Sequence, residues 1–304
     1  MLGKCIVFAV FCYGFSWSLL ANLDAADALF MQRSQGEAMS LKAREAYSKL
    51  LGSAQGDVKT YVIAQMSRLD LFRSVMLPKV PLEKAKEILE GCVTNIEAIK
   101  QTQSQEYFYL KTACLAFRAK LAKDTAERLD FGGQIKDIQQ KVLEASTDSN
   151  GNLKGGFEGG GCLRVLAGIY SNPKATIFKL FVPRKALEFA TAALETDSKL
   201  NRPFPNEMTG RDYFENYYYQ AFAKIGIAID EADLNEAKEA VKILKDTMEE
   251  IEFLIDSGEI DTNKREGETR YYYRVMGEVR DAASQCIASG DGWLDCLIEE
   301  LERF

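Results

Sequence analysis

The sequence predicts an all-α protein whose antiparallel helical hairpins stack as an α-solenoid, and three observations predict it. Apolar residues recur at the helical spacing of three and four through almost the whole chain. Only 6 of the 304 residues are proline, and few segments alternate polar and apolar residues as strands do. The breaks between segments are short, and consecutive helices with short connections pack antiparallel. An irregular helical bundle is the alternative.

The expected helices follow from this spacing in chain order. They end where residues that break helices collect, as in the stretches 53–56, 78–81 and 201–206. The expected helices cover residues 23–33, 36–51, 57–76, 81–100, 105–122, 132–145, 160–171, 183–196, 210–230, 233–256, 267–288 and 293–303.

Small residues seven positions apart mark helices that pack closely against a partner helix. Ala186 and Ala193 form such a pair, and Ala85 and Cys92 form another. The segment from Leu163 to Tyr170 has the large and small apolar positions of a first repeat helix. This combination is typical of tetratricopeptide repeats, and the irregular spacing indicates divergent copies. We therefore expect one tetratricopeptide-like domain over residues 22–304.

The N-terminal segment has the features of an export signal. Lys4 supplies a positive charge, residues 5–21 are apolar, and Ser16 and Ser18 are small residues at a plausible cleavage site. We expect a signal peptide over residues 1–18, with an uncleaved membrane anchor as the alternative. Beyond residue 21 the sequence predicts no membrane span, and the expected compartment is the periplasm.

The composition argues against several functions. The chain has no histidine, which excludes catalysis by a histidine base and zinc sites with histidine ligands. Its net charge of −7 disfavours nucleic acid as a partner. The loop 148–152 begins like a calcium loop, but Leu153 stands where that loop needs glycine. We expect no metal, no cofactor and no enzymatic activity.

Five glycines, Gly155, Gly156, Gly159, Gly160 and Gly161, lie at the start of the helix expected over 160–171. A phosphate loop needs Gly–Lys–Ser/Thr there, but Cys162 and Leu163 follow Gly161. The favoured explanation is that glycine lets this loop press against neighbouring helices. An anion site near Arg164 is the alternative. Because a buried arginine needs partners, we expect Arg164 to clamp the loop, with Glu158 as the nearest acidic residue.

The same region resembles a known family. The pattern is a glycine pair, an arginine, Leu–Ala, a tyrosine and a helix with spaced alanines, and it resembles the helical T-component of tripartite ATP-independent periplasmic (TRAP) transporters. The resemblance implies tetratricopeptide-like hairpins and a role beside a periplasmic solute-binding protein. Members are commonly lipoproteins, whereas no lipobox precedes Cys5 or Cys12. The matching residues are Gly160, Gly161, Arg164, Leu166, Ala167, Tyr170, Ala186 and Ala193.

Two tyrosine triplets, 217–219 and 271–273, predict a recognition surface. Three consecutive helical residues point in different directions, so the middle tyrosines fit the core stripes and the outer ones do not. Exposed tyrosines suit recognition because they are large and rigid and carry a polar tip. The candidates for a partner groove are Arg164, Glu158, Gly160, Gly161, Tyr217, Tyr219, Tyr271 and Tyr273.

Two cysteine pairs lie symmetrically about expected turns between helices. Cys92 and Cys114 are equally distant from Gln103, and Cys286 and Cys296 are equally distant from Asp291. In an antiparallel hairpin, equal offsets place two residues at the same level, and export supplies oxidising conditions. We expect disulfides in both pairs, with packed thiols as the alternative.

These features together predict an exported helical scaffold that binds a protein or peptide. The resemblance suggests a solute-binding protein of a TRAP-type uptake system as its partner. A general scaffold of the cell envelope is one alternative, and a periplasmic enzyme is another. The sequence is compatible with an oligomer and does not fix the number of subunits.

Overall fold

A computed structural model describes residues 19–77, 80–99, 104–197, 199–200, 203–204, 207–259 and 265–301. The predicted signal peptide, residues 1–18, lies outside the described residues. The chain divides into two compact units, Met1–Thr102 and Gln103–Phe304. One continuous domain over residues 22–304 stays a prediction.

The first unit consists of helices that pack as consecutive hairpins. α2 packs against α3, and α3 packs against α4. A buried carboxylate, Asp27, accepts hydrogen bonds from Tyr47 and Tyr61 at 2.5 Å and 2.9 Å. The elements are a helix over 19–31, η1 (Arg33–Gln35), α2 (Glu37–Leu51), α3 (Gly56–Leu71), the π-helical turn η2 (Phe72–Met76) and α4 (Leu82–Glu97).

The second unit continues the all-helical pattern, with one small hairpin of strands in which Lys199 pairs with Met208. Its elements are α5 (Gln105–Lys120), α6 (Thr125–Ala145), α7 (Gly161–Ser171), η3 (Pro173–Phe178), α8 (Pro183–Leu194), β1 (Lys199–Leu200), β2 (Glu207–Met208), η4 (Gly210–Asp212), α9 (Phe214–Glu231), α10 (Leu234–Ser257), α12 (Glu266–Ala288), η5 (Gly290–Gly292) and α13 (Trp293–Leu301).

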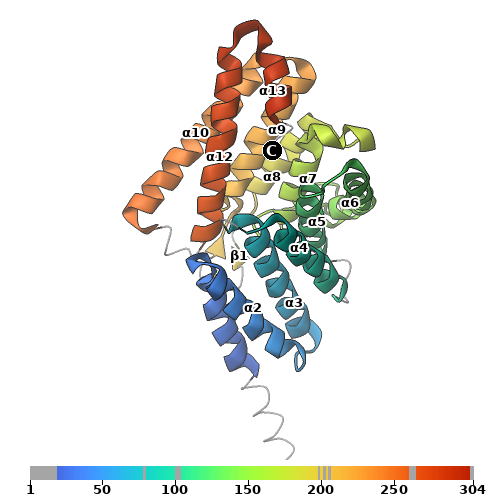
Figure 1. The fold of residues 1–304 in the computed structure, drawn as a ribbon, viewed down its shortest axis with the longest axis vertical. Coiled ribbons are helices and arrows are strands. Elements are labelled where there is room, and N and C mark those ends of the chain that lie inside the picture. The colour runs from blue at the N-terminus through green and yellow to red at the C-terminus, as the bar shows by residue number, and fades with distance from the viewer. Residues whose placement is uncertain are drawn as a thin grey trace, which may run out of the picture. The chain divides into compact units, whose positions relative to one another are not determined.

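These helices form stacked hairpins. α5 pairs with α6, α7 with α8, α9 with α10, and α12 with α13. The first helices of the hairpins, here called the A helices, also contact one another in the order α5, α7, α9, α12. Figure 1 shows α10 and α12 side by side, as the stacking requires. The protein is all-α and its hairpins stack as in a helical-repeat solenoid, as the sequence predicts.

Small residues lie where the repeat pattern requires close packing. Ala186 and Ala193 are completely buried in α8, and Ala85 and Cys92 are buried in α4. Leu163 and Leu166 are completely buried in α7. The spacing therefore identified true core positions on three helices.

One predicted helix starts in the wrong place. The pattern predicted a start at residue 132, but α6 begins at Thr125, capped by the Asp124 carboxylate, which accepts a hydrogen bond from the Glu127 amide at 2.9 Å. Gly132 and Gly133 lie in the interior of this helix rather than at its start. A Cβ on Gly132 would stand 2.3 Å from the Phe178 ring of η3, so this glycine makes room for η3.

Two other boundaries differ. The segment expected from residue 210 is a short 3₁₀ turn, and α9 begins only at Phe214. Thr209 and Asp212 form a capping box on that turn, which satisfies its first amides locally. The helix expected over 57–76 is α3 followed by the π-helical turn η2.

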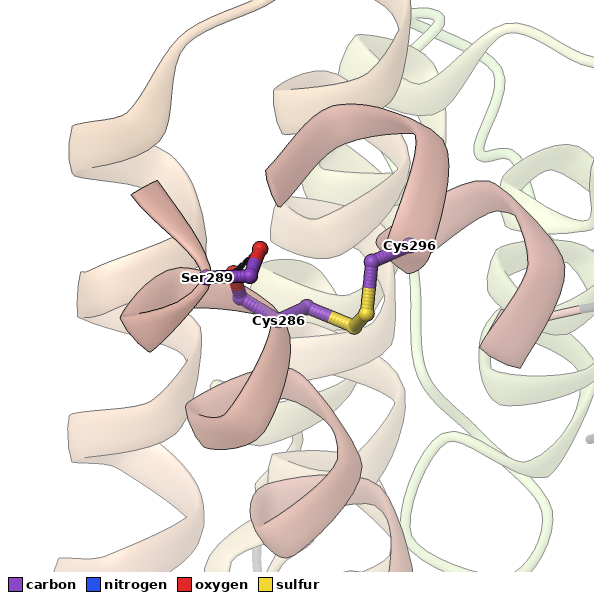
Figure 2. Close-up of a disulfide and its surroundings, with 3 residues drawn as sticks. All are labelled: Cys286, Ser289 and Cys296. Carbon is purple, nitrogen blue, oxygen red and sulfur yellow. Dashed lines mark hydrogen bonds between the residues drawn. A yellow bond between two sulfur atoms is a disulfide. The ribbon is translucent and has the colours of Figure 1, made fainter. Parts of the chain in front are cut away.

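The last hairpin carries a disulfide. Cys286 of α12 and Cys296 of α13 are bonded, with Cα atoms 5.3 Å apart, as predicted (Figure 2). The Ser289 hydroxyl donates a hydrogen bond of 2.7 Å to the Cys286 carbonyl at the turn. Cys92 and Cys114 each take part in a disulfide, and their predicted pairing with each other stays a prediction. Cys162 is a buried free thiol. None of the helices in the described part of the chain has the length and apolar character of a membrane span.

Candidate functional site

Arg164 lies in the interior of the second unit and has three polar partners. Its guanidinium donates to the Asn216 side-chain oxygen at 2.8 Å and to the Glu158 carbonyl at 3.2 Å. The Glu215 carboxylate lies 3.8 Å away. Arg164 therefore clamps the glycine-rich loop, as expected, but through the backbone of Glu158, with Glu215 as a buried anion nearby.

Glu215 joins Arg164 to a second buried arginine. Arg265, just before α12, donates to both Glu215 oxygens, at 2.5 Å and 3.2 Å. All three side chains are almost fully buried. Burial raises the pKa of Glu215, but the charges of Arg265 and Arg164 lower it more strongly, so the net pKa lies below its ordinary value. Glu215 is thus held as a carboxylate.

Two tyrosine rings cover the arginines. The Arg265 guanidinium lies 4.0 Å from the centre of the Tyr213 ring, and Arg164 lies 5.3 Å from it. Arg164 also lies 5.7 Å from the centre of the Tyr109 ring on α5. Burial raises the pKa of Tyr109 well above its usual range, and the Glu158 charge adds to the shift. Both phenols therefore stay neutral.

The glycine segment fills the space beside this cluster. Glu158, Gly159 and Gly160 all have positive φ, at 47°, 53° and 84°. A Cβ on Gly159 would stand 2.2 Å from the Tyr213 ring, and one on Gly160 would stand 2.7 Å from the Ala193 backbone. A Cβ on Gly161 would stand 3.0 Å from the Tyr109 ring. Close packing explains these glycines, as the favoured interpretation predicted.

Asn216 joins the loop to its neighbours. Its side-chain amide donates to the Gly159 carbonyl at 2.9 Å and to the Gly210 carbonyl at 2.6 Å, while its oxygen accepts from Arg164. One completely buried side chain thus fixes the entrance of α7 and the turn before α9. The amides of Phe157 and Gly161 are bonded within the unit, to the Gln105 side chain and to the Phe157 carbonyl.

The tyrosine triplets meet between α9 and α12. Tyr218 and Tyr272 are buried with ring centres 5.6 Å apart, as their positions in the core stripes predicted. Tyr219 and Tyr271 are half-buried and contact Tyr272 with ring centres 6.4 Å and 5.2 Å apart. A Cβ on Gly168 of α7 would stand 2.8 Å from Tyr219. Rings from α9 and α12 therefore form one layer that reaches α7.

The two remaining tyrosines do not join this layer. The Tyr273 hydroxyl donates to the Glu252 carboxylate of α10. Tyr217 is half-buried, and burial raises its pKa, with the Glu250 charge of α10 adding to the shift. Of the predicted groove residues, the structure brings together Glu158, Gly160, Gly161 and Arg164 at the glycine loop. Tyr219 and Tyr271 lie in the tyrosine layer between α9 and α12.

Two hollows lie elsewhere. One of about 600 Å³ lies between the helix 19–31 and α2, and one of about 450 Å³ follows α8 from Arg184 to Glu195. Neither hollow is lined by a predicted groove residue.

Within the described residues, no cluster of acidic or cysteine side chains has the arrangement of a metal site.

The main partners of Arg164 escaped the sequence reasoning. Glu215 and Asn216 lie beside the tyrosine triplet at the start of α9, and Arg265 lies before α12. The sequence offered one signal for Glu215 and Asn216: they are polar residues at the edge of an apolar core stripe. Comparison with protein-family models gives no match, and comparison with curated proteins gives no significant match.

Proposed function

We propose that this protein is an exported helical scaffold that binds a protein or peptide on the A helices of its second unit. The observation that carries the proposal is the tyrosine layer: Tyr219 and Tyr271 are only half-buried, on A helices that pack side by side. Rigid aromatic side chains with polar tips provide contact area at a low cost in conformational entropy.

The buried ion cluster supports this proposal. Arg164, Glu215, Arg265 and Asn216 connect the glycine loop, α7, α9 and the start of α12. Buried hydrogen-bonded networks fix one arrangement of the elements that they join. A surface held in one conformation loses less entropy when it binds a partner.

The cysteines bear on the compartment. Disulfides form and persist in oxidising environments, so the bonded cysteines support an exported protein. We propose the periplasm as the compartment, and the resemblance to TRAP T-components leads us to propose a solute-binding protein as the partner. A general envelope scaffold would have other partners.

Photocrosslinking in cells of the source organism tests the proposal. A benzophenone amino acid replaces Tyr271 in one variant and Phe253 in the control, because Phe253 is 66% exposed on α10, which is not an A helix. We expect a crosslinked protein at position 271 and none at 253. A solute-binding protein in the crosslink supports the transport role, and another envelope protein supports the general scaffold. Absence of any crosslink at 271 would overturn the proposal.

A further inference from the structure

The hollow in the first unit is a groove between two helices, here called the N-terminal groove. It lies between the helix 19–31 and α2 and has a volume of about 600 Å³. The lining residues of each helix recur three or four positions apart, so each wall is one helix face. The groove is lined by Leu19, Asn22, Ala25, Leu29, Lys42, Glu45, Ala46, Lys49, Leu50 and Ser53.

The helix 19–31 presents this wall on the side away from α3. Asp27 accepts a hydrogen bond of 2.9 Å from Tyr61 of α3, so the face that carries Asp27 points toward α3. Ala25 and Leu29 are each two positions from Asp27, which is about 200° round a helix. The wall of the groove is therefore on the opposite face.

α2 has the same arrangement. Arg44 donates a hydrogen bond of 2.6 Å to Asp70 of α3, so its face points toward α3. Lys42 and Ala46 are each two positions from Arg44, again about 200° round the helix. The groove thus opens on the side of the first hairpin that α3 does not cover.

A helical solenoid stacks a neighbour on each side of a hairpin. α3 packs on one side of this hairpin, whereas Ala25, Lys42 and Lys49 on the groove side are exposed in the described part of the chain. From Leu19 to Leu29 the groove follows about 15 Å of helix, close to three turns. Its place and length suit one further stacked helix.

The apolar lining suits a helix as well. Ala25 and Ala46 come from opposite walls, and packed helices approach more closely where side chains are small. Leu29 is half-buried and Leu50 is buried, so part of the lining is already withdrawn from water. A helix with one apolar face would remove the rest from water, which is favourable.

Two lysines determine the charge of the groove. Lys42 and Lys49 are seven positions apart on α2, about 10 Å along the helix, and both are exposed. Glu45 is the only carboxylate among the described residues that line the groove. A helix that lies along α2 can meet both lysines with two carboxylates that are also seven positions apart.

The charge of the first unit does not outweigh these lysines. Residues 19–102 contain 11 basic and 10 acidic side chains, whereas residues 103–304 contain 26 and 35. The groove therefore belongs to a nearly neutral unit of an acidic chain. A second copy is a poorer occupant, because antiparallel pairing of α2 with itself would bring Lys42 of one copy near Lys49 of the other.

We infer that the N-terminal groove binds one amphipathic helix of another protein, with an apolar face and two carboxylates seven positions apart. The apolar face lies along the alanines and leucines of the groove, and the carboxylates pair with Lys42 and Lys49. This is a second binding surface, separate from the tyrosine layer, and it does not depend on the proposed function.

Fluorescence anisotropy with labelled peptides tests the inference on the exported full chain. The first probe is an alanine-based helix of about 15 residues with leucines and two glutamates, seven positions apart, on one face. One control probe has lysines for the glutamates, and another has a central proline that breaks the helix. We expect the glutamate probe to bind about tenfold more tightly than either control at low salt. Equal or tighter binding of either control would overturn the inference.

Two alanines of the helix 19–31 provide matched variants. Ala25 and Ala28 are both exposed, and of the two only Ala25 lines the groove. Ala25→Trp should fill the groove and weaken binding of the glutamate probe about tenfold, whereas Ala28→Trp should leave it unchanged. Equal effects of the two variants would contradict the assignment of the site.

A charge reversal tests the lysines. The double variant Lys42→Glu, Lys49→Glu should bind the lysine probe about tenfold more tightly than the glutamate probe, a gain that misfolding cannot produce. A double variant that still prefers the glutamate probe would contradict the inference.

Sedimentation velocity of the free chain tests the other occupant. Self-association that Ala25→Trp abolishes would assign the groove to a second copy and overturn the inference, whereas a monomer supports it. If position 271 crosslinks a protein but the glutamate probe does not bind, the scaffold proposal stands and only this inference fails.

Discussion

At the scale of single residues, Glu215 has the most consequential position in the second unit. It is the carboxylate that both Arg164 and Arg265 approach in the interior. Removing one member of a buried ion cluster leaves the remaining charges without compensation, which costs more than the cluster contributes when intact. On the surface, where water screens the charges, the same ion pairs would contribute little to the free energy of unfolding.

We expect Glu215→Ala to lower the free energy of unfolding by about 3–5 kcal/mol, because two buried arginines lose their carboxylate. The matched control is Glu249→Ala on α10, where the side chain is exposed and Lys245 lies 3.7 Å away. That change should stay within about 0.5 kcal/mol. Chemical denaturation followed by circular dichroism measures both. Similar losses for the two variants would show that the cluster is not a stabilising unit.

The lowered pKa of Glu215 predicts a pH dependence. Its folded-state pKa lies below the ordinary value of 4.5, so its contribution is fully present above that pH. The contribution is lost as the pH falls through the folded-state pKa. The difference in unfolding free energy between wild type and Glu215→Gln should therefore be constant from pH 7 to 5 and shrink below about pH 4. Denaturation curves across this range measure it, and a difference that grows on acidification would contradict the sign.

At the scale of elements, two adjacent glycines in α6 provide a matched comparison. A Cβ on Gly132 meets the Phe178 ring at 2.3 Å, whereas one on Gly133 meets nothing within 4 Å. Gly133→Ala should stabilise the protein by about 0.5–1 kcal/mol through helix propensity. Gly132→Ala should instead destabilise it by about 1–2 kcal/mol, since overpacking exceeds that gain. Thermal melts compare the variants, and equal stabilisation by both would show that η3 does not press on α6.

The same elements show what sequence can predict. Ala186 and Ala193 identified a packed helix because helical spacing depends only on neighbours in the chain. The predicted start of α6 at residue 132 was wrong, because Asp124 caps the helix further upstream. The space beside Gly132 is used by Phe178, which no local pattern around the glycine contains. The pairing of Arg164 with Glu215 depends on how α7 meets α9, which no local pattern contains.

At the scale of the whole molecule, the cysteines allow a test by counting. Four cysteines are disulfide-bonded, and Cys162 is free and buried. If the exported chain has lost residues 1–18, and with them Cys5 and Cys12, it should show one thiol per chain after denaturation without reductant. Thiol titration measures this, and intact mass identifies the first residue. Five thiols in the same chain would show that neither disulfide forms in the native compartment.

The Cys286–Cys296 bond also has a consequence for turnover. α13 has nine residues, fewer than the roughly 12–15 that an isolated helix needs to be stable in water. Its attachment to α12 is therefore strengthened by a bond that only an oxidising compartment maintains. A chain that stays among cytosolic reductants lacks this bond, and we expect its last hairpin to fray and expose cleavage sites. The disulfide would thus let proteases distinguish chains that have been exported from those that have not.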